Sequence, residues 1–182
     1  MRVDTTAIRL KDGRQALLRA PSPDEAEAML RAYVQIAEEC AYVANYPEEI
    51  RYTVETERDY LDDSLSAPNS AMIVAEVDGE LAGNCQIVFK RTQKTRHRAS
   101  VMIGLKRAYQ RLGIGSAMFR AMEQIARARG ARQLELDCIE GNEPALGLYH
   151  KMGFEEVGRL PDAYRFKDGS RHAEIRMRKA LA

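Results

Sequence analysis

The stretch VMIGLKRAYQRLGIGSAMF, residues 101–119, joins the end of an apolar strand to the start of an amphipathic helix. Between the two lies a turn in which Gly113 and Gly115 leave room where other residues would place a side chain. Apolar residues then recur at helical spacing and predict one buried helix face: Ile114, Met118, Met122 and Ile125. A glycine-rich turn at the start of a helix leaves several backbone N–H groups unpaired at the positive end of the helix dipole. We therefore expect this turn to bind an anion.

The turn differs from two other phosphate-binding motifs. It lacks the GxGxxG spacing of dinucleotide-binding folds, and Gly115-Ser116-Ala117 stands where the phosphate loop of NTPases has Gly-Lys followed by Ser or Thr. Residues 110–115 (QRLGIG) instead resemble motif A of the GCN5-related N-acetyltransferases, the GNAT superfamily. A second segment, residues 142–154 (NEPALGLYHKMGF), resembles that family's N-x-x-A-x-x-L-Y-x-K-x-G-F pattern. The two matches have the order and separation of the family, and the resemblance covers about residues 71–179.

The resemblance implies an α/β fold in a single domain over residues 1–182. It implies a mixed, strongly twisted sheet of six or seven strands, flanked by about four helices, with splayed central strands. The residue pattern gives the same order of elements. Asp12-Gly13 and Asp78-Gly79 predict two hairpin turns, and helix starts are expected near Ser22 and at Thr53 or Glu55.

Two helices are expected before the first central strand, and in the family this region shapes the acceptor pocket. The first helix is expected to turn one set of residues inward: Ala26, Leu30, Tyr33 and Ala37. The second helix is expected to bury Tyr60 and Leu61.

The resemblance also implies acetyl-CoA as cosubstrate, with no metal. The turn amides would hold its pyrophosphate, and free backbone groups of Ile103 and Leu105 would pair with the pantetheine arm. Lys151 would reach a phosphate or be solvated. The implied cofactor-binding residues are Ile103, Leu105, Arg111, Leu112, Gly113, Ile114, Gly115, Ser116, Asn142, Tyr149 and Lys151. Many relatives have glycine where this chain has Arg111, which favours a charged contact with the phosphates.

Two residues are candidates for the chemistry. A tyrosine in a helix is usually part of the core, but the family motif implies that Tyr149 points at the sulfur of CoA. A phenol with a pKa of about 10 is protonated at neutral pH and can donate to a departing thiolate. Asp137 lies on a strand with alternating apolar and acidic residues, five residues before Asn142, where several relatives carry a general base. A salt bridge to a neighbouring arginine is an equal alternative for Asp137, and Glu39 and His97 are the next candidate bases.

Composition limits the other functions. The 182 residues carry 28 Lys and Arg against 27 Asp and Glu, so the net charge of +1 gives no general attraction to nucleic acid or a membrane. The three cysteines lack CxxC spacing, and no signal-peptide or membrane-length apolar run occurs, so we expect a cytoplasmic protein with reduced cysteines. The basic segment 90–98 is expected to be a solvated loop, with contact to an acidic substrate or nucleic acid as the alternative.

These observations predict transfer of an acetyl group from acetyl-CoA to a primary amine of a small molecule or peptide. The amine would attack directly in a ternary complex, and a homodimer is possible. Two alternatives remain open: a catalytically silent CoA-binding module, and a partner-binding protein.

Overall fold

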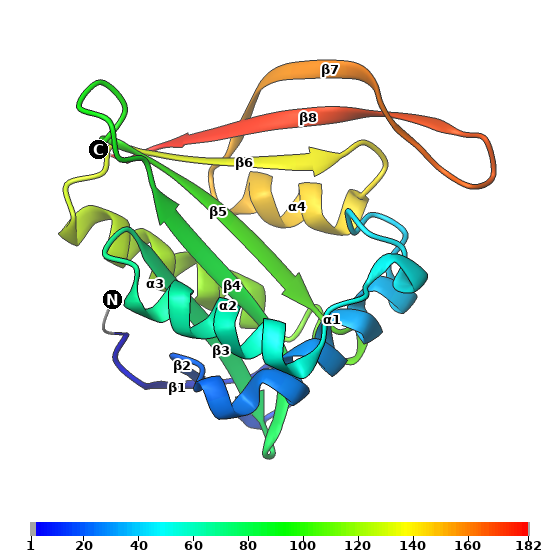
Figure 1. Cartoon of the computed structure of the whole chain (residues 1–182). Helices are drawn as coiled ribbons and strands as arrows, with labels where there is room; N and C mark the ends of the chain where they lie inside the picture. The colour runs from blue at the N-terminus through cyan, green and yellow to red at the C-terminus, as the bar shows by residue number, and fades with distance from the viewer. Residues whose placement is uncertain (1–2, 182) are drawn as a thin grey trace. The chain divides into compact units, whose positions relative to one another are not determined.

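The computed structural model describes residues 3–181. Over these residues it contains a mixed sheet in the order β1-β2-β3-β4-β5-β6-β8-β7 and four α-helices (Figure 1). The strands are β1 Thr6–Arg9, β2 Gln15–Arg19, β3 Ser70–Val77, β4 Glu80–Phe89, β5 Arg98–Leu105, β6 Gln133–Ile139, β7 Glu155–Arg165 and β8 Arg171–Ala180. The helices are α1 Ala26–Glu39, α2 Val54–Ser66, α3 Ile114–Ala128 and α4 Glu143–Lys151. The predicted α/β class is confirmed, but the sheet has eight strands rather than six or seven, because the short β1 pairs with β2 along its whole length.

The chain forms two compact units. The first extends to Val88 and includes Met102–Arg120, and the second consists of Phe89–Val101 and the chain from Ala121 onward. Strand β5 and helix α3 therefore each contribute residues to both units.

In the first unit, β1 to β4 form an antiparallel meander with α1 and α2 packed side by side (Figure 1). Ser22 caps the 3-10 turn that leads into α1, and Thr53 caps α2, as predicted. The predicted inner face of α1 is wrong in part: Leu30 and Tyr33 are half-buried. The buried positions of α1 are Ala26, Met29, Ala32, Ile36 and Ala37.

The core of this unit forms where the two helices meet the sheet. One buried cluster contains Ala26, Met29, Leu61, Met72, Val74 and Leu81. Leu61 is fully buried as predicted, but Tyr60 is exposed. The Tyr60 hydroxyl donates to Oε1 of the buried Gln86, 2.9 Å away, so its polar end is satisfied at the edge of the core and the ring stays in contact with water.

A β-bulge interrupts β4. Ala75 pairs with Gly83, but the next residue of β3, Glu76, pairs with Leu81, so Ala82 is the extra residue. Gly83 has a φ of +150° and lies so close to β5 that a Cβ there would be 2.1 Å from the Gly104 carbonyl oxygen. The bulge thus requires glycine at residue 83 and brings β4 against the end of β5.

In the second unit, β6, β8 and β7 are antiparallel neighbours, with β7 and β8 forming a long hairpin beside β6 (Figure 1). Leu134, Leu136 and Cys138 are buried, whereas Asp137 is exposed. The Asn142 side chain caps α4 by accepting from the Ala145 N–H at 3.4 Å, and Gly153 follows the helix at φ +85°. Both ends of α4 therefore match the sequence prediction.

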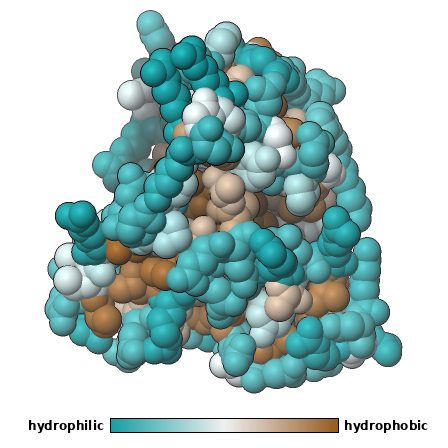
Figure 2. Space-filling view, turned by 90° about the vertical axis from the view of Figure 1, so that its right-hand side faces the viewer, coloured by the Kyte–Doolittle hydropathy of each residue, from teal (hydrophilic) through white to brown (hydrophobic). Residues whose placement is uncertain are grey.

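Hydrophilic residues cover most of the face drawn in Figure 2, and hydrophobic residues show between them in several places. Within residues 3–181, no helix combines the length and apolar character needed to cross a membrane.

Candidate functional site

The predicted anion-binding turn lies in the first unit, where it leads from β5 into α3. Arg111 and Gly113 both have left-handed backbone conformations, with φ of +61° and +101°. The Ala117 N–H donates to the Gly113 carbonyl at 3.1 Å and begins the hydrogen-bond series of α3. The amides of residues 113–116 precede that first bond, so they have no partner within the helix and lie at its positive end.

This turn has the space and charge that a diphosphate needs. A Cβ built on Gly113 would meet no atom within 4 Å, so the turn faces open space. The Arg111 side chain is exposed beside it. A non-glycine residue with left-handed φ costs about 1–2 kcal/mol, and Arg111 carries this cost. Unpaired amides, a helix dipole and a guanidinium together fit an anion such as the pyrophosphate of acetyl-CoA.

Hydrogen bonds from three sides fix the turn and the end of β5. The Lys11 N–H donates to the Leu112 carbonyl at 3.1 Å, which ties the turn to the β1–β2 hairpin. The Gln110 amide nitrogen donates to the Leu105 carbonyl at 3.1 Å. The Lys106 N–H donates to the carbonyl of Ala82, in the β4 bulge, at 3.0 Å. The geometry of the turn therefore exists before any ligand binds.

The end of β5 also carries Ile103 and Leu105, the residues predicted to pair with the pantetheine arm. Both are half-buried. Within the second unit, the parallel pairing of β5 with β6 covers three residue pairs and ends at Ser100 and Glu135. Val101 and Leu136, the next residues, are no longer paired in the part of the chain that is described, although β6 stays paired with β8 through Ile139.

Tyr149 lies in the second unit, in the last turn of α4. Its side chain is 8% exposed, and its ring centroid is 6.2 Å from that of Phe154 at an interplanar angle of 58°. The capped start of α4 at Asn142 and the tight turn after it fix the direction of this helix. Lys151, at the helix end, is exposed.

Asp137 is also in the second unit, on β6, and its side chain is 58% exposed. The nearest cation is Arg176 on the paired strand β8, whose Nε lies 3.8 Å from the carboxylate and closer, at 3.1 Å, to Glu174. Partial burial, followed by the charge of Glu174, raises the pKa of Asp137 above its usual value. A contact this long and this exposed to water is a weak salt bridge, so Asp137 keeps the character of a base.

Glu174, Arg176 and Tyr164 form the surroundings of Asp137, and the sequence analysis did not single them out. The Tyr164 hydroxyl donates to Glu174 at 3.5 Å, and burial together with Glu174 and Asp137 raises the pKa of Tyr164. The alternating polar residues of β8 indicate that one face of this strand is polar. Only the strand register, in which Asp137 is opposite Arg176, shows that this face surrounds Asp137.

Of the two alternative bases, the Glu39 side chain is held in a structural contact, whereas His97 is hydrogen-bonded through its backbone. Glu39 accepts a hydrogen bond from the Arg107 N–H at 2.5 Å, and the contact counters the effect of burial to leave the pKa of Glu39 lowered. The His97 carbonyl accepts from the Arg132 N–H at 2.8 Å at the end of the exposed basic loop 90–98. Within residues 3–181, no group of three or more His, Cys, Asp or Glu side chains has the arrangement to hold a metal.

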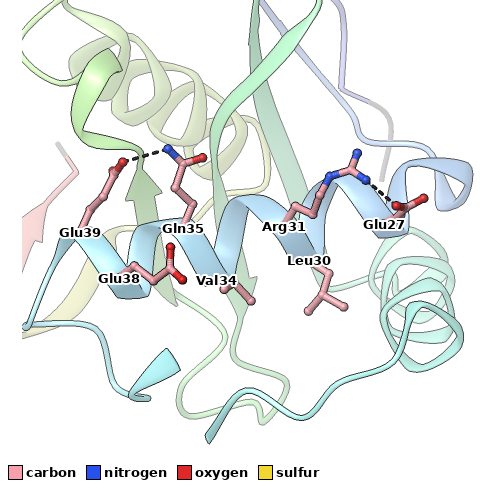
Figure 3. Close-up of a pocket in the computed structure, with 7 residues that line it drawn as sticks. All are labelled: Glu27, Leu30, Arg31, Val34, Gln35, Glu38 and Glu39. Atoms are coloured by element: carbon pink, nitrogen blue, oxygen red, sulfur yellow. Dashed lines mark hydrogen bonds and ion pairs between the residues drawn. The ribbon is translucent and has the colours of Figure 1, made fainter. Parts of the chain in front are cut away.

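A hollow of about 700 Å³ lies along α1 in the first unit (Figure 3). Leu30 and Val34 form its apolar part, and the Glu27–Arg31 and Gln35–Glu39 contacts run along it. All of its walls come from this one helix. Glu39, one of the two alternative candidate bases, is among them, whereas Tyr149, Asp137 and the predicted cofactor-binding residues are not. It therefore adds nothing to the candidate site.

Comparisons with known proteins agree with this geometry. Residues 25–154 match the profile of the family described as the Acetyltransferase (GNAT) family. A candidate ribosomal protein bS18-alanine N-acetyltransferase of Bacillus subtilis (strain 168) is 32% identical over 111 residues, which make up 60% of this chain and 70% of that protein.

Solved structures share the fold. A GNAT-family acetyltransferase from Streptococcus pneumoniae superposes with a TM-score of 0.83 at 24% identity, over 91% of this chain and 99% of that chain. A candidate acetyltransferase from Salmonella typhimurium, solved with acetyl-CoA, superposes with a TM-score of 0.78 at 16% identity, over 92% and 94% of the two chains. The family match spans most of the chain and includes the turn before α3, Asp137 and Tyr149. The chain belongs to the GNAT family and is an N-acetyltransferase.

Proposed function

We propose that this N-acetyltransferase moves the acetyl group of acetyl-CoA to a primary amine of a small molecule or peptide, by direct attack in a ternary complex. The observation that carries the proposal is the turn before α3, where unpaired amides, the open side of Gly113 and the Arg111 guanidinium all suit a diphosphate. Asp137 supplies the general base, and Tyr149 supplies the general acid.

The amine must first lose a proton, because an ammonium has no lone pair. Asp137, directly or through one water, accepts that proton, and its raised pKa makes it a stronger base than an ordinary aspartate. The nitrogen lone pair then attacks the thioester carbonyl carbon. The backbone N–H of Leu105 stabilises the negative charge that develops on the carbonyl oxygen.

Collapse of the tetrahedral intermediate breaks the carbon–sulfur bond. Tyr149 donates its phenolic proton to the departing thiolate, and the products are the amide and CoA. Arg111 and the amides of residues 113–116 hold the pyrophosphate throughout. The phenolate of Tyr149 recovers a proton from solvent, and Asp137 returns its proton to solvent, before the next turnover.

Two of the three cysteines are unsuited to forming a covalent acetyl-enzyme. Cys85 is fully buried, and burial raises its pKa so far that no thiolate forms at neutral pH. Cys138 is buried and donates its thiol proton to the Ile139 carbonyl at 3.6 Å. Neither thiol has the exposed, low-pKa character of a nucleophile.

Two measurements test the proposal. Intact-mass spectrometry after incubation with acetyl-CoA alone should show unmodified protein, and CoA thiol should be released only after an amine is added. A panel of amines, amino acids and peptides with free N-termini then identifies the acceptor. An acetyl-enzyme that forms without amine and transfers its acetyl group when amine is added would overturn direct attack.

A further inference from the structure

Glu57 is a partly buried carboxylate in the first turn of α2. Within residues 3–181, its side chain has no hydrogen bond or ion pair, and burial alone raises its pKa. Glu55, in the same helical turn, is fully exposed, and hydrogen bonds with its own backbone and Thr53 lower its pKa. The helix dipole therefore does not explain the raised pKa of Glu57, because the dipole acts on both residues.

Near the start of α2, two tyrosine rings stack on each other. Tyr33 of α1 and Tyr52, just before α2, have ring centroids 6.4 Å apart and an interplanar angle of only 21°. The Tyr33 hydroxyl donates to Oδ1 of Asn45 at 2.9 Å, which fixes the Tyr33 ring. Tyr52 is 52% exposed, so its ring is open to solvent rather than enclosed by packing.

Tyr33 interacts electrostatically with both of the other residues. Burial raises the pKa of Tyr33, and the interactions with Tyr52 and Glu57 raise it further. Aromatic rings present negative faces, and a partly buried carboxylate without a partner is costly. A positive charge is attracted both by the faces of aromatic rings and by a carboxylate.

We propose that Tyr33, Tyr52 and Glu57 form a binding site for an alkylammonium group. Glu57 supplies the counter-charge, and the rings contact the methylene or methyl groups around the nitrogen. We assign the bound alkylammonium group to the acceptor amine, and this assignment rests on the proposed acetyl transfer. The acceptor class is thereby narrowed to cationic amines, such as diamines or peptides with a basic side chain.

Binding can be measured without catalysis. The probe is 1,5-diaminopentane, with uncharged 1,5-pentanediol as its matched control, added without acetyl-CoA to protein carrying labelled tyrosine rings. We expect the ring NMR signals of Tyr33 and Tyr52, two of the eight tyrosines, to shift with the diamine and not with the diol. The Tyr52→Phe spectrum assigns the Tyr52 signal and should keep diamine binding, because the ring face remains.

Two variants separate recognition from folding. Glu57→Gln should weaken diamine binding about fivefold or more, and Tyr52→Ala about threefold or more. Glu57→Gln should also leave the melting temperature unchanged or higher, because it removes an uncompensated charge. Glu55→Gln is the matched control and should leave diamine binding unchanged. Diol shifts as large as those of the diamine, or equal diamine affinity in Glu57→Gln and the wild type, would overturn the site.

Kinetics test the link to the acceptor. If acetyl transfer occurs, 1,5-diaminopentane should have a lower KM than 1-aminopentane, and Glu57→Gln should remove most of that difference. Transfer to both amines at equal KM, together with no diamine binding, overturns this inference and leaves the acetyltransferase function intact. Diamine binding that Glu57→Gln weakens, in a protein that acetylates no amine, supports the cation site and overturns its assignment to the acceptor.

Discussion

Gly83 gives the sharpest structural prediction, because its surroundings set the size of the effect. A Cβ at this position would lie 2.1 Å from the Gly104 carbonyl oxygen and 2.8 Å from the Leu105 Cα, where ordinary contacts begin near 3.4 Å. In Gly83→Ala, the backbone of β4 or β5 must therefore move by about 1.3 Å. Side chains cannot absorb this movement, because the nearest atoms belong to the backbone.

Two costs add in this variant. Overpacking of this kind costs about 1–3 kcal/mol, and a left-handed φ of +150° adds about 1–2 kcal/mol for alanine. We expect Gly83→Ala to lose about 3 kcal/mol of unfolding free energy, which lowers the Tm of a chain of this size by about 6–12 °C. Because the Leu105 backbone moves with the strand, acetyl-CoA binding should weaken as well.

Urea unfolding and isothermal titration with acetyl-CoA measure both effects, and two glycines serve as controls. Gly79→Ala has a φ of +81° but open space, so it carries the conformational cost without the clash. Gly104→Ala makes only an ordinary contact, 3.4 Å from the Ile36 Cδ1, and should stay within about 1 kcal/mol of the wild type. If Gly83→Ala is no less stable than Gly79→Ala and binds acetyl-CoA normally, the close approach of β4 to β5 does not hold the site.

Two further predictions concern the turn and the base. Acetyl-CoA at a hundredfold excess over its Kd should stabilise the wild type by about 2.7 kcal/mol; Gly113→Trp should abolish the Tm shift, whereas Gly169→Trp, also at positive φ in open space, should keep it. The acidic limb of kcat/KM should reflect the raised pKa of Asp137, so removal of the negative charge in Glu174→Gln should move the limb to lower pH. Loss of the positive charge in Arg176→Gln should move it to higher pH, and a limb that neither variant moves belongs to another group.

Local signals in the sequence predicted local structure well. Asn142 caps α4, Gly153 ends it in a left-handed conformation, and Asp78-Gly79 forms a hairpin turn with φ of +53° and +81°. Each of these features depends on a few neighbouring residues, so the residue types suffice to predict it. The glycine turn before α3 belongs to the same class.

Features that depend on distant packing were not predictable from the sequence. The exposure of Tyr60 follows from how α2 meets Gln86, and the open face at Asp137 depends on how β6, β8 and β7 pair. The contact of Asp137 with Arg176 joins residues that are 39 positions apart in the chain, and a one-residue change of register would replace that neighbour. The bulge at Gly83 is similar, because a single glycine in a strand does not reveal what approaches it.

Tyr149→Phe tests the proposed mechanism most directly, because it removes one oxygen and leaves the ring packed against Phe154. The measurement is the single-turnover rate of CoA thiol release, with acetyl-CoA and an accepted amine both saturating. We expect unchanged acetyl-CoA affinity and Tm, together with a rate about 10²-fold lower, because the thiolate departs without its proton donor. An equal rate in Tyr149→Phe and the wild type would contradict acid catalysis by Tyr149 and assign this residue to packing alone.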